Sequence, residues 1–66
     1  MFGRRLNEAR KSKGFTAQQM ADALNITLRS YRYYESGSRQ PSFDMLIKIA
    51  DKLEVSIDYL FARDGY

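Results

Sequence analysis

The chain lacks cysteine, histidine and tryptophan, and its 66 residues include one proline and four glycines. Without cysteine or histidine, disulfide bonds, thiolate or imidazole metal sites and histidine- or cysteine-based catalysis are excluded. Charged residues interrupt every apolar segment within a few positions, so no stretch has the length of a signal peptide or a membrane-spanning helix. We therefore expect a protein of the reducing cytoplasm, without a cofactor and without a metal site.

Two further patterns are missing. No alternating apolar run typical of a β-strand occurs, whereas apolar residues recur at helical spacing in five segments. No acid–base pair, activated nucleophile or phosphate-binding glycine loop can be assembled from these residues. The sequence therefore predicts an all-α protein that is not an enzyme. At this length we expect one domain, residues 1–66, with a small core.

The charge is unevenly distributed. The formal net charge is +3, but residues 1–40 hold eight of the eleven Lys and Arg residues and only three acidic residues. Residues 41–66 hold the other three basic residues and five acidic ones. This asymmetry indicates a half that faces a polyanion such as nucleic acid. Small domains also often carry a few excess charges, so composition leaves both interpretations open.

The segment 16–37 predicts two short helices joined by a tight turn. Each helix begins at a capping threonine, Thr16 or Thr27, that follows an apolar residue able to contact the side chain five positions later. Gln19 can return a hydrogen bond to the backbone N–H of Thr16, which completes a capping box. The turn is Asn25-Ile26-Thr27, and Gly37 is expected to end the second helix.

The remaining segments predict three more helices. The first contains Phe2, Leu6 and Ala9 at helical spacing and ends before Gly14. Ser42 and Ser56 are expected to cap the fourth and fifth helices. The expected inward residues of these two helices are Phe43, Leu46, Ile47, Ala50, Leu53, Ile57, Leu60 and Phe61. On the third helix, the phase of Tyr31 and Tyr34 predicts core positions, whereas Arg29 and Tyr33 point outward.

These residues resemble a known family. The run from Thr16 to Pro41, with Ala21, Ile26 and the ending Tyr34-Glu35-Ser36-Gly37, is similar to the phage-repressor (Cro/CI, XRE-type) helix-turn-helix family, as is Val55-Ser56-Ile57-Asp58-Tyr59-Leu60. The resemblance covers nearly the whole chain. It implies a compact five-helix bundle that binds DNA, with the helix-turn-helix in about residues 16–37.

The resemblance implies that the recognition helix, residues 27–36, enters the major groove. By position, the base contacts would be Leu28, Arg29, Arg32 and Tyr33. An arginine can donate two hydrogen bonds to guanine, and Leu28 can meet a thymine methyl group. Two roles are open for Tyr33, which either stacks on a methyl group or sends its hydroxyl to a phosphate. Arg29 could also be an ordinary solvated arginine.

Phosphate contacts in this family come from helix N-termini and from the loop after the recognition helix. The corresponding residues here are Gln18, Gln19, Thr27, Ser30, Ser38 and Arg39. Arg39 is the strongest of these candidates, because its loop position offers it no obvious structural partner. Position 17, often a phosphate-binding glutamine in the family, is Ala17, and Glu54 stands where a helix-ending glycine is common.

The resemblance also implies a structural ion pair between Arg10 and Glu35. Because one recognition helix reads few bases, we expect a homodimer on DNA. The dimer contact would involve Tyr59 and Phe61, although these aromatics could equally cover the core of a monomer. The predicted function is sequence-specific binding of double-stranded DNA by a small transcriptional regulator, a bacterial or phage repressor associated with the nucleoid when bound. The alternative is a protein-interaction module of the same fold, such as an antitoxin-like partner.

Overall fold

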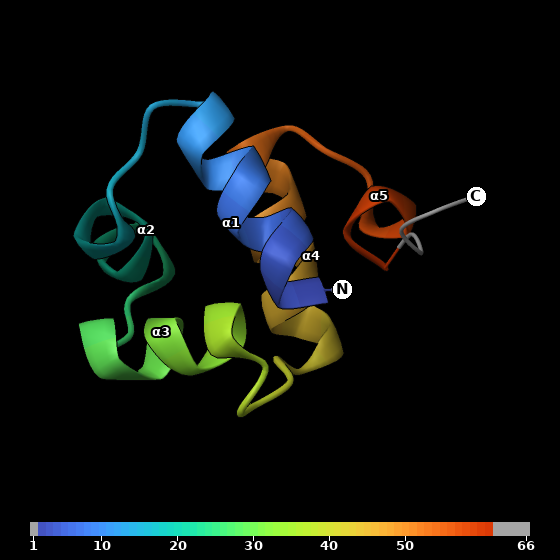
Figure 1. Cartoon of the computed structure of the whole chain (residues 1–66). Helices are drawn as coiled ribbons and strands as arrows, with labels where there is room; N and C mark the ends of the chain where they lie inside the picture. The colour runs from blue at the N-terminus through green and yellow to red at the C-terminus, as the bar shows by residue number, and fades with distance from the viewer. Residues whose placement is uncertain (1, 62–66) are drawn as a thin grey trace.

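The structure is a computed structural model that describes residues 2–61 (Figure 1). It contains the helices α1 (Phe2–Ser12), α2 (Ala17–Leu24), α3 (Leu28–Ser36), α4 (Phe43–Leu53) and α5 (Ile57–Phe61). No β-strand occurs between residues 2 and 61, and the prediction of an all-α fold is confirmed. None of the helices described has the length and apolarity needed to cross a membrane.

Side-chain caps begin α2, α3, α4 and α5 as predicted. The Thr16 hydroxyl accepts a hydrogen bond from the Gln19 backbone N–H at 3.0 Å, and the Gln19 side chain accepts one from the Thr16 N–H at 2.9 Å. This is the predicted capping box. A hydroxyl-to-backbone cap also precedes each of the next three helices, at Thr27, Ser42 and Ser56. These caps satisfy backbone donors that a helix start leaves without partners.

Left-handed residues end the helices. Asn25 follows α2 with φ 59°, and Gly37 follows α3 with φ 83°. Glu54 adopts the same conformation after α4, with φ 57°, although a glycine would do so with less strain. Helix α4 therefore ends at Glu54 without a glycine.

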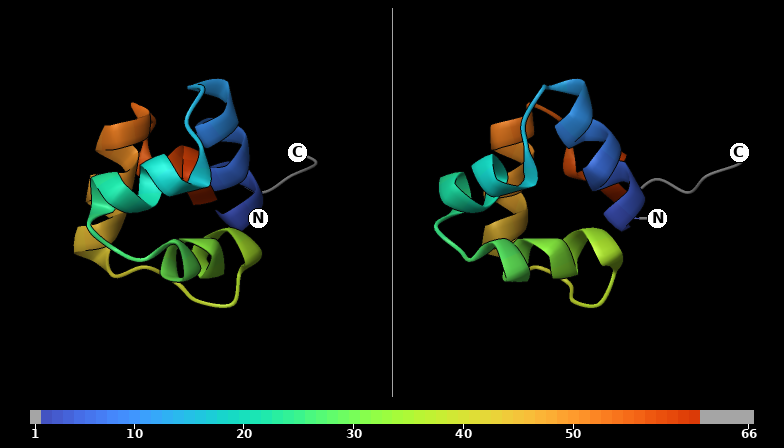
Figure 2. Two further views of the ribbon diagram at one scale, coloured as in Figure 1. Left: turned by 90° about the vertical axis from the view of Figure 1, so that its left-hand side faces the viewer. Right: turned by 60° about the vertical axis from the view of Figure 1, so that its left-hand side comes forward.

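The core lies between α1, α2, α4 and α5, and α3 closes one end of it. In all three views α3 and the loop that follows it form the lower edge of the molecule, so one side of α3 is left uncovered (Figures 1 and 2). Tyr31 is the one fully buried residue of α3 and points to the core. The other core residues are Phe2, Leu6, Ala9, Met20, Ala21, Leu24, Leu46, Ile49, Ala50, Leu53 and Leu60.

The expectation that Phe43 and Ile47 of α4 lie in the core is wrong. Phe43 is 67% exposed and Ile47 is 39% exposed, whereas Ile49, which was not expected to be inward, is completely buried. Residues along a helix turn by about 100° each. The buried face follows Leu46, Ile49 and Leu53, and Ile47 falls outside it, while Phe43 stands in the first turn at the end of this face.

The tyrosines and α5 depart less from the expectation. Tyr34 is half-buried and packs against the core rather than inside it. In α5, Leu60 is buried and Ile57 is partly buried, but Phe61 is 44% exposed. The Phe61 ring lies against Phe2, with centroids 5.1 Å apart, so it covers the edge of the core.

Candidate nucleic-acid interface

The uncovered side of α3 carries basic side chains. Arg29 and Arg32 are exposed, and Leu28 and Tyr33 are half-buried, while Tyr31 on the opposite side is fully buried. This division follows from helical periodicity, because a helix with one inward aromatic leaves the residues two positions to either side facing outward. The structure therefore places Arg29, Arg32 and Tyr33 toward the outward side of α3, whereas Leu28 is half-buried in the first turn of the helix.

Three of the outward residues form a cluster. The Arg29 Nε donates a hydrogen bond to the Tyr33 hydroxyl at 2.8 Å. The guanidinium carbons of Arg29 and Arg39 lie 5.7 and 5.2 Å from the centroid of the Tyr33 ring. The expectation that Arg39 has no structural partner is therefore wrong, because the loop after Gly37 turns back and brings Arg39 over Tyr33. We call Arg29, Tyr33 and Arg39 the arginine–tyrosine cluster.

The other residues expected at phosphates already make contacts within the protein. The Gln18 side chain donates to Asp22 at 2.9 Å, and the Gln19 side chain accepts from the cap of α2. Two hydroxyl contacts account for the others. The Thr27 and Ser30 oxygens lie 3.0 Å apart, and the Ser36 and Ser38 oxygens are separated by the same distance. These side chains shape the starts of α2 and α3 and the loop after α3.

A hydrogen-bonded group on the inner side holds the end of α3. The Glu35 carboxylate accepts from Arg10 Nε at 2.7 Å, from Asn7 Nδ2 at 2.9 Å and from the Tyr31 hydroxyl. Arg10 also donates from Nη1 to the carbonyl of Phe15 at 2.8 Å. The contact between Arg10 and Glu35 is the one that the family resemblance implies. We call Asn7, Arg10, Tyr31 and Glu35 the carboxylate network.

The carboxylate network changes the acidity of its members. Burial raises the pKa of Glu35, but hydrogen bonds from Arg10, Tyr31 and Asn7 outweigh it and lower the pKa below its ordinary value. The hydrogen bond to Glu35 raises the pKa of Arg10. Burial and then the hydrogen bond to Glu35 raise the pKa of Tyr31. Glu35 is therefore ionised and Tyr31 protonated near neutral pH.

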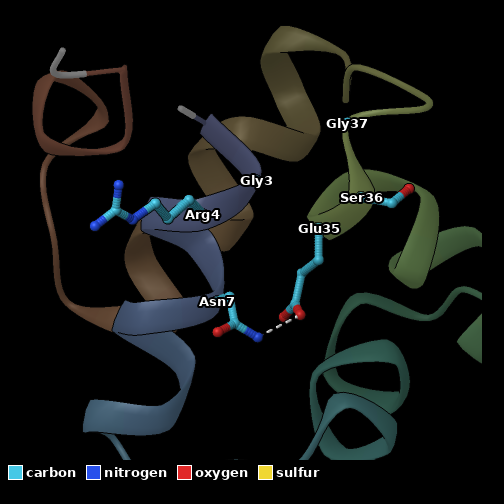
Figure 3. Close-up of a pocket in the computed structure, with 6 residues that line it drawn as sticks. All are labelled: Gly3, Arg4, Asn7, Glu35, Ser36 and Gly37. Atoms are coloured by element: carbon cyan, nitrogen blue, oxygen red, sulfur yellow. Dashed lines mark hydrogen bonds between the residues drawn. The ribbon is translucent and has the colours of Figure 1, made fainter. Parts of the chain in front are cut away.

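The start of α1 approaches the end of α3 closely at Gly3. A Cβ atom on Gly3 would lie 2.2 Å from the backbone oxygen of Glu35, which is closer than atoms can pack. Figure 3 shows the hollow beside this crossing, with Asn7 and Glu35 pointing toward each other. Its lining consists of Gly3, Arg4, Asn7, Glu35, Ser36 and Gly37. The hollow is part of the junction that positions α3.

Sequence reasoning missed three of these features. Asn7 stands one helical turn before Arg10, so spacing could have placed both on the side of α1 that faces Glu35. Tyr33 stands one turn after Arg29, so spacing could also have indicated their contact. The close approach at Gly3 leaves no such signal, because it depends on where α3 lies. Within residues 2–61, no group of three or more acidic side chains is placed to hold a metal ion.

Comparison with known proteins also assigns the chain to the helix-turn-helix family. A family model described as helix-turn-helix matches residues 6–60. The HTH-type transcriptional regulator YqaE of Bacillus subtilis is 50% identical over 65 residues, which cover 98% of this chain and 56% of the relative. The cryptic phage CTXphi transcriptional repressor RstR of Vibrio cholerae is 51% identical over 59 residues, covering 89% of this chain and 53% of the relative.

A solved structure also matches. The crystal structure of a transcriptional regulator from Listeria innocua aligns with all of this chain and 64% of the other, with a TM-score of 0.83 and 31% identity. The chain spans about half the length of the curated relatives it matches. These relatives are named as regulators and repressors of transcription, and none of the names is that of an enzyme.

Proposed function

Since the chain belongs to the helix-turn-helix family of the Cro/CI, or XRE, type, we propose that it binds double-stranded DNA sequence-specifically with α3 in the major groove. The observation that carries the proposal is the two-sided character of α3. Its inner side is anchored by the buried Tyr31, and its outer side offers Arg29 and Arg32 to solvent. A helix held in this way meets the geometric requirement for reading base edges.

The contacts divide into base recognition and backbone positioning. Arg29 and Arg32 provide paired donors for guanine, Leu28 provides an apolar contact for a thymine methyl group, and Tyr33 lies among them. The residues proposed to face phosphates are Gln18, Gln19, Thr27, Ser30, Ser38 and Arg39. Phosphate contacts supply affinity and register, and base contacts supply specificity.

The biological role in this proposal is repression of transcription in a bacterial or phage context. A domain of this kind prevents access to a promoter by occupying an operator. The support is the similarity to a protein that is named as a phage transcriptional repressor. The proposed location is the bacterial cytoplasm, at the nucleoid when DNA is bound.

We propose that two copies bind one pseudo-palindromic site, with half-sites about 34–36 Å apart. Phe61 on α5 is the proposed centre of the contact between copies, because it stays 44% exposed at the edge of the core. Tyr59, two residues earlier on α5, is partly buried, and the Arg5 guanidinium carbon lies 5.1 Å from its ring centroid. Aromatic residues such as Tyr and Phe are enriched at protein–protein interfaces.

Selection of duplexes from a random-sequence pool tests DNA binding. The wild-type chain should enrich a defined sequence, and its affinity should fall steeply with added salt. Arg29→Ala should relax the preference at one or two positions, whereas Arg39→Ala should weaken binding to all sequences and reduce the salt slope by about 1. Failure to enrich any sequence, or affinity that is indifferent to salt, would contradict the proposal and favour a protein-interaction module.

Light scattering on the bound duplex tests the dimer. Phe61→Ser should leave one copy on a site that binds two copies of the wild-type chain. Phe43→Ser is the matched control, because it removes an even more exposed aromatic, 67% exposed, from α4. Two copies remaining with Phe61→Ser, or loss of the second copy with Phe43→Ser alone, would place the contact elsewhere.

A further inference from the structure

Tyr33 lies between two arginines that are proposed to perform different tasks, one at bases and one at phosphates. We infer that Tyr33 is a positioning residue, which orients Arg29 through its hydroxyl and Arg39 through its ring and backbone, and does not read DNA with its own hydroxyl. The inference rests on the proposed function and assigns a mechanism to one residue of that site.

The hydroxyl acts on Arg29. Its oxygen accepts from Arg29 Nε at 2.8 Å, and the two residues are one helical turn apart on α3. With the Nε–H engaged, the terminal nitrogens of Arg29 remain to donate in parallel to the two acceptors of guanine. A guanidinium that is already oriented loses less conformational freedom on binding than a mobile one. The hydrogen bond should therefore improve the discrimination that Arg29 provides.

The ring and the backbone act on Arg39. The Arg39 guanidinium lies over the Tyr33 ring at 5.2 Å, and the Arg39 backbone N–H donates to the Tyr33 carbonyl at 3.2 Å. Two contacts of different kinds thus hold the loop against the end of α3. The positive charges of Arg29 and Arg39 repel each other, but each guanidinium makes a favourable cation–π contact with the Tyr33 ring before DNA is bound. This arrangement keeps both cations on the outward surface.

A role in folding does not account for these contacts. Tyr33 is half-buried, but it is not among the residues that form the apolar core, as Tyr31 does, or pack against it, as Tyr34 does. Its hydroxyl accepts a hydrogen bond from Arg29, and its ring lies against the guanidinium groups of Arg29 and Arg39. Removal of the Tyr33 hydroxyl should consequently leave thermal stability nearly unchanged.

The test uses duplexes that the wild-type chain selects from a random-sequence pool. Tyr33→Phe keeps the ring and removes the hydroxyl, so preference for the base pair that Arg29 reads should fall about three- to tenfold while the salt slope stays the same. Tyr33→Leu also removes the ring, so the affinity for all duplexes should fall and the salt slope should decrease by about 1. Tyr34→Phe is the control and should change neither quantity.

The decisive comparison introduces Tyr33→Phe into the Arg29→Ala variant. If Tyr33 acts through Arg29, the double variant should match Arg29→Ala in both affinity and preference. A full additional loss in the double variant would show that the hydroxyl contacts DNA itself and would overturn the inference. Unchanged preference with Tyr33→Phe alone would also overturn it, while the proposed function would stand. A wild-type chain that selects no sequence would instead reject the proposed function, and the inference with it.

Discussion

Arg10 and Glu35 are joined by a hydrogen-bonded ion pair between α1 and the end of α3, with Arg10 Nε 2.7 Å from Glu35 Oε2. Their side chains are only 12% and 15% exposed, so the pair is largely shielded from water. Arg10 also binds the carbonyl of Phe15 just before α2. One arginine therefore connects α1, the start of the helix-turn-helix and the end of α3, and it does so away from the outward surface of α3.

Replacing either partner of this ion pair alone should destabilise the protein. We expect Arg10→Leu or Glu35→Leu to lower the free energy of unfolding by about 1–3 kcal/mol, because each leaves a shielded polar group without its partner. The double variant should be less destabilised than the two single losses added together, with a coupling of about 0.5–3 kcal/mol. Urea denaturation of the four proteins gives this coupling.

The exposed pair of Arg4 and Glu8 is the control for this cycle. Its nitrogen and oxygen are 3.4 Å apart, and the side chains are 64% and 49% exposed. A surface pair at this spacing contributes about 0.3–0.5 kcal/mol. Equal coupling in both cycles would mean that shielding of Arg10 and Glu35 has no energetic consequence.

Stability should fall in acid because of Glu35. Its pKa is lower in the folded protein than the ordinary value of 4.5, so the unfolded chain takes up the proton first as pH falls. The stabilisation from Glu35 is complete above about pH 4.5 and is lost as the pH falls through the pKa of Glu35 in the folded protein. Chemical denaturation from neutral pH to well below 4.5 should show the decline, and Glu35→Gln should make it shallower.

The second acidic group with a lowered pKa provides the comparison. The hydrogen bond from Lys13 lowers the pKa of Glu54, but Glu54 is fully exposed to solvent. Water and salt screen such a contact, so Glu54→Gln should remove less of the acid-induced decline than Glu35→Gln does. A larger effect of Glu54→Gln than of Glu35→Gln would mean that the exposed Glu54 contact, and not Glu35, causes the acid-induced decline.

Gly3→Ala should destabilise the protein, against the helix preference of alanine. In a helix, alanine is favoured over glycine by about 1 kcal/mol. Here the added Cβ would collide with the Glu35 backbone, so α1 must shift, at a net cost of about 1–3 kcal/mol. Thermal or urea denaturation measures the sign. Lys11→Ala, at an exposed position of the same helix, should change stability by less than about 0.5 kcal/mol.

The corrected face of α4 can be tested with one chemical change at two positions. Ile49→Val removes a methylene group from a completely buried side chain and should cost about 0.5–1.5 kcal/mol. Ile47→Val makes the same change on a side chain that is 39% exposed, and its effect should be close to zero. Similar losses at both positions would contradict the burial pattern.

Local signals determined the elements of this fold. The hydroxyl caps at Thr16, Thr27 and Ser42 were predictable because each acts on backbone groups within a few positions. The outward phase of Arg29 followed from helical periodicity. On α4 the same reasoning chose Ile47 in place of Ile49, because the sequence shows an apolar stripe but not which neighbouring helix will cover it.

What the tertiary structure decided concerns residues distant along the chain. Glu35 gains Asn7 of α1 as a partner beside Arg10, which the family resemblance implies, Gly3 is needed because α3 crosses directly over it, and Arg39 lies on Tyr33 because the loop reverses direction. Caps and periodicity are properties of a single segment, whereas these contacts depend on the distance and angle between segments. The sequence by itself therefore determined the five helices and the outward side of α3, and only the packing of those helices decided how α3 is held and how its arginines are arranged.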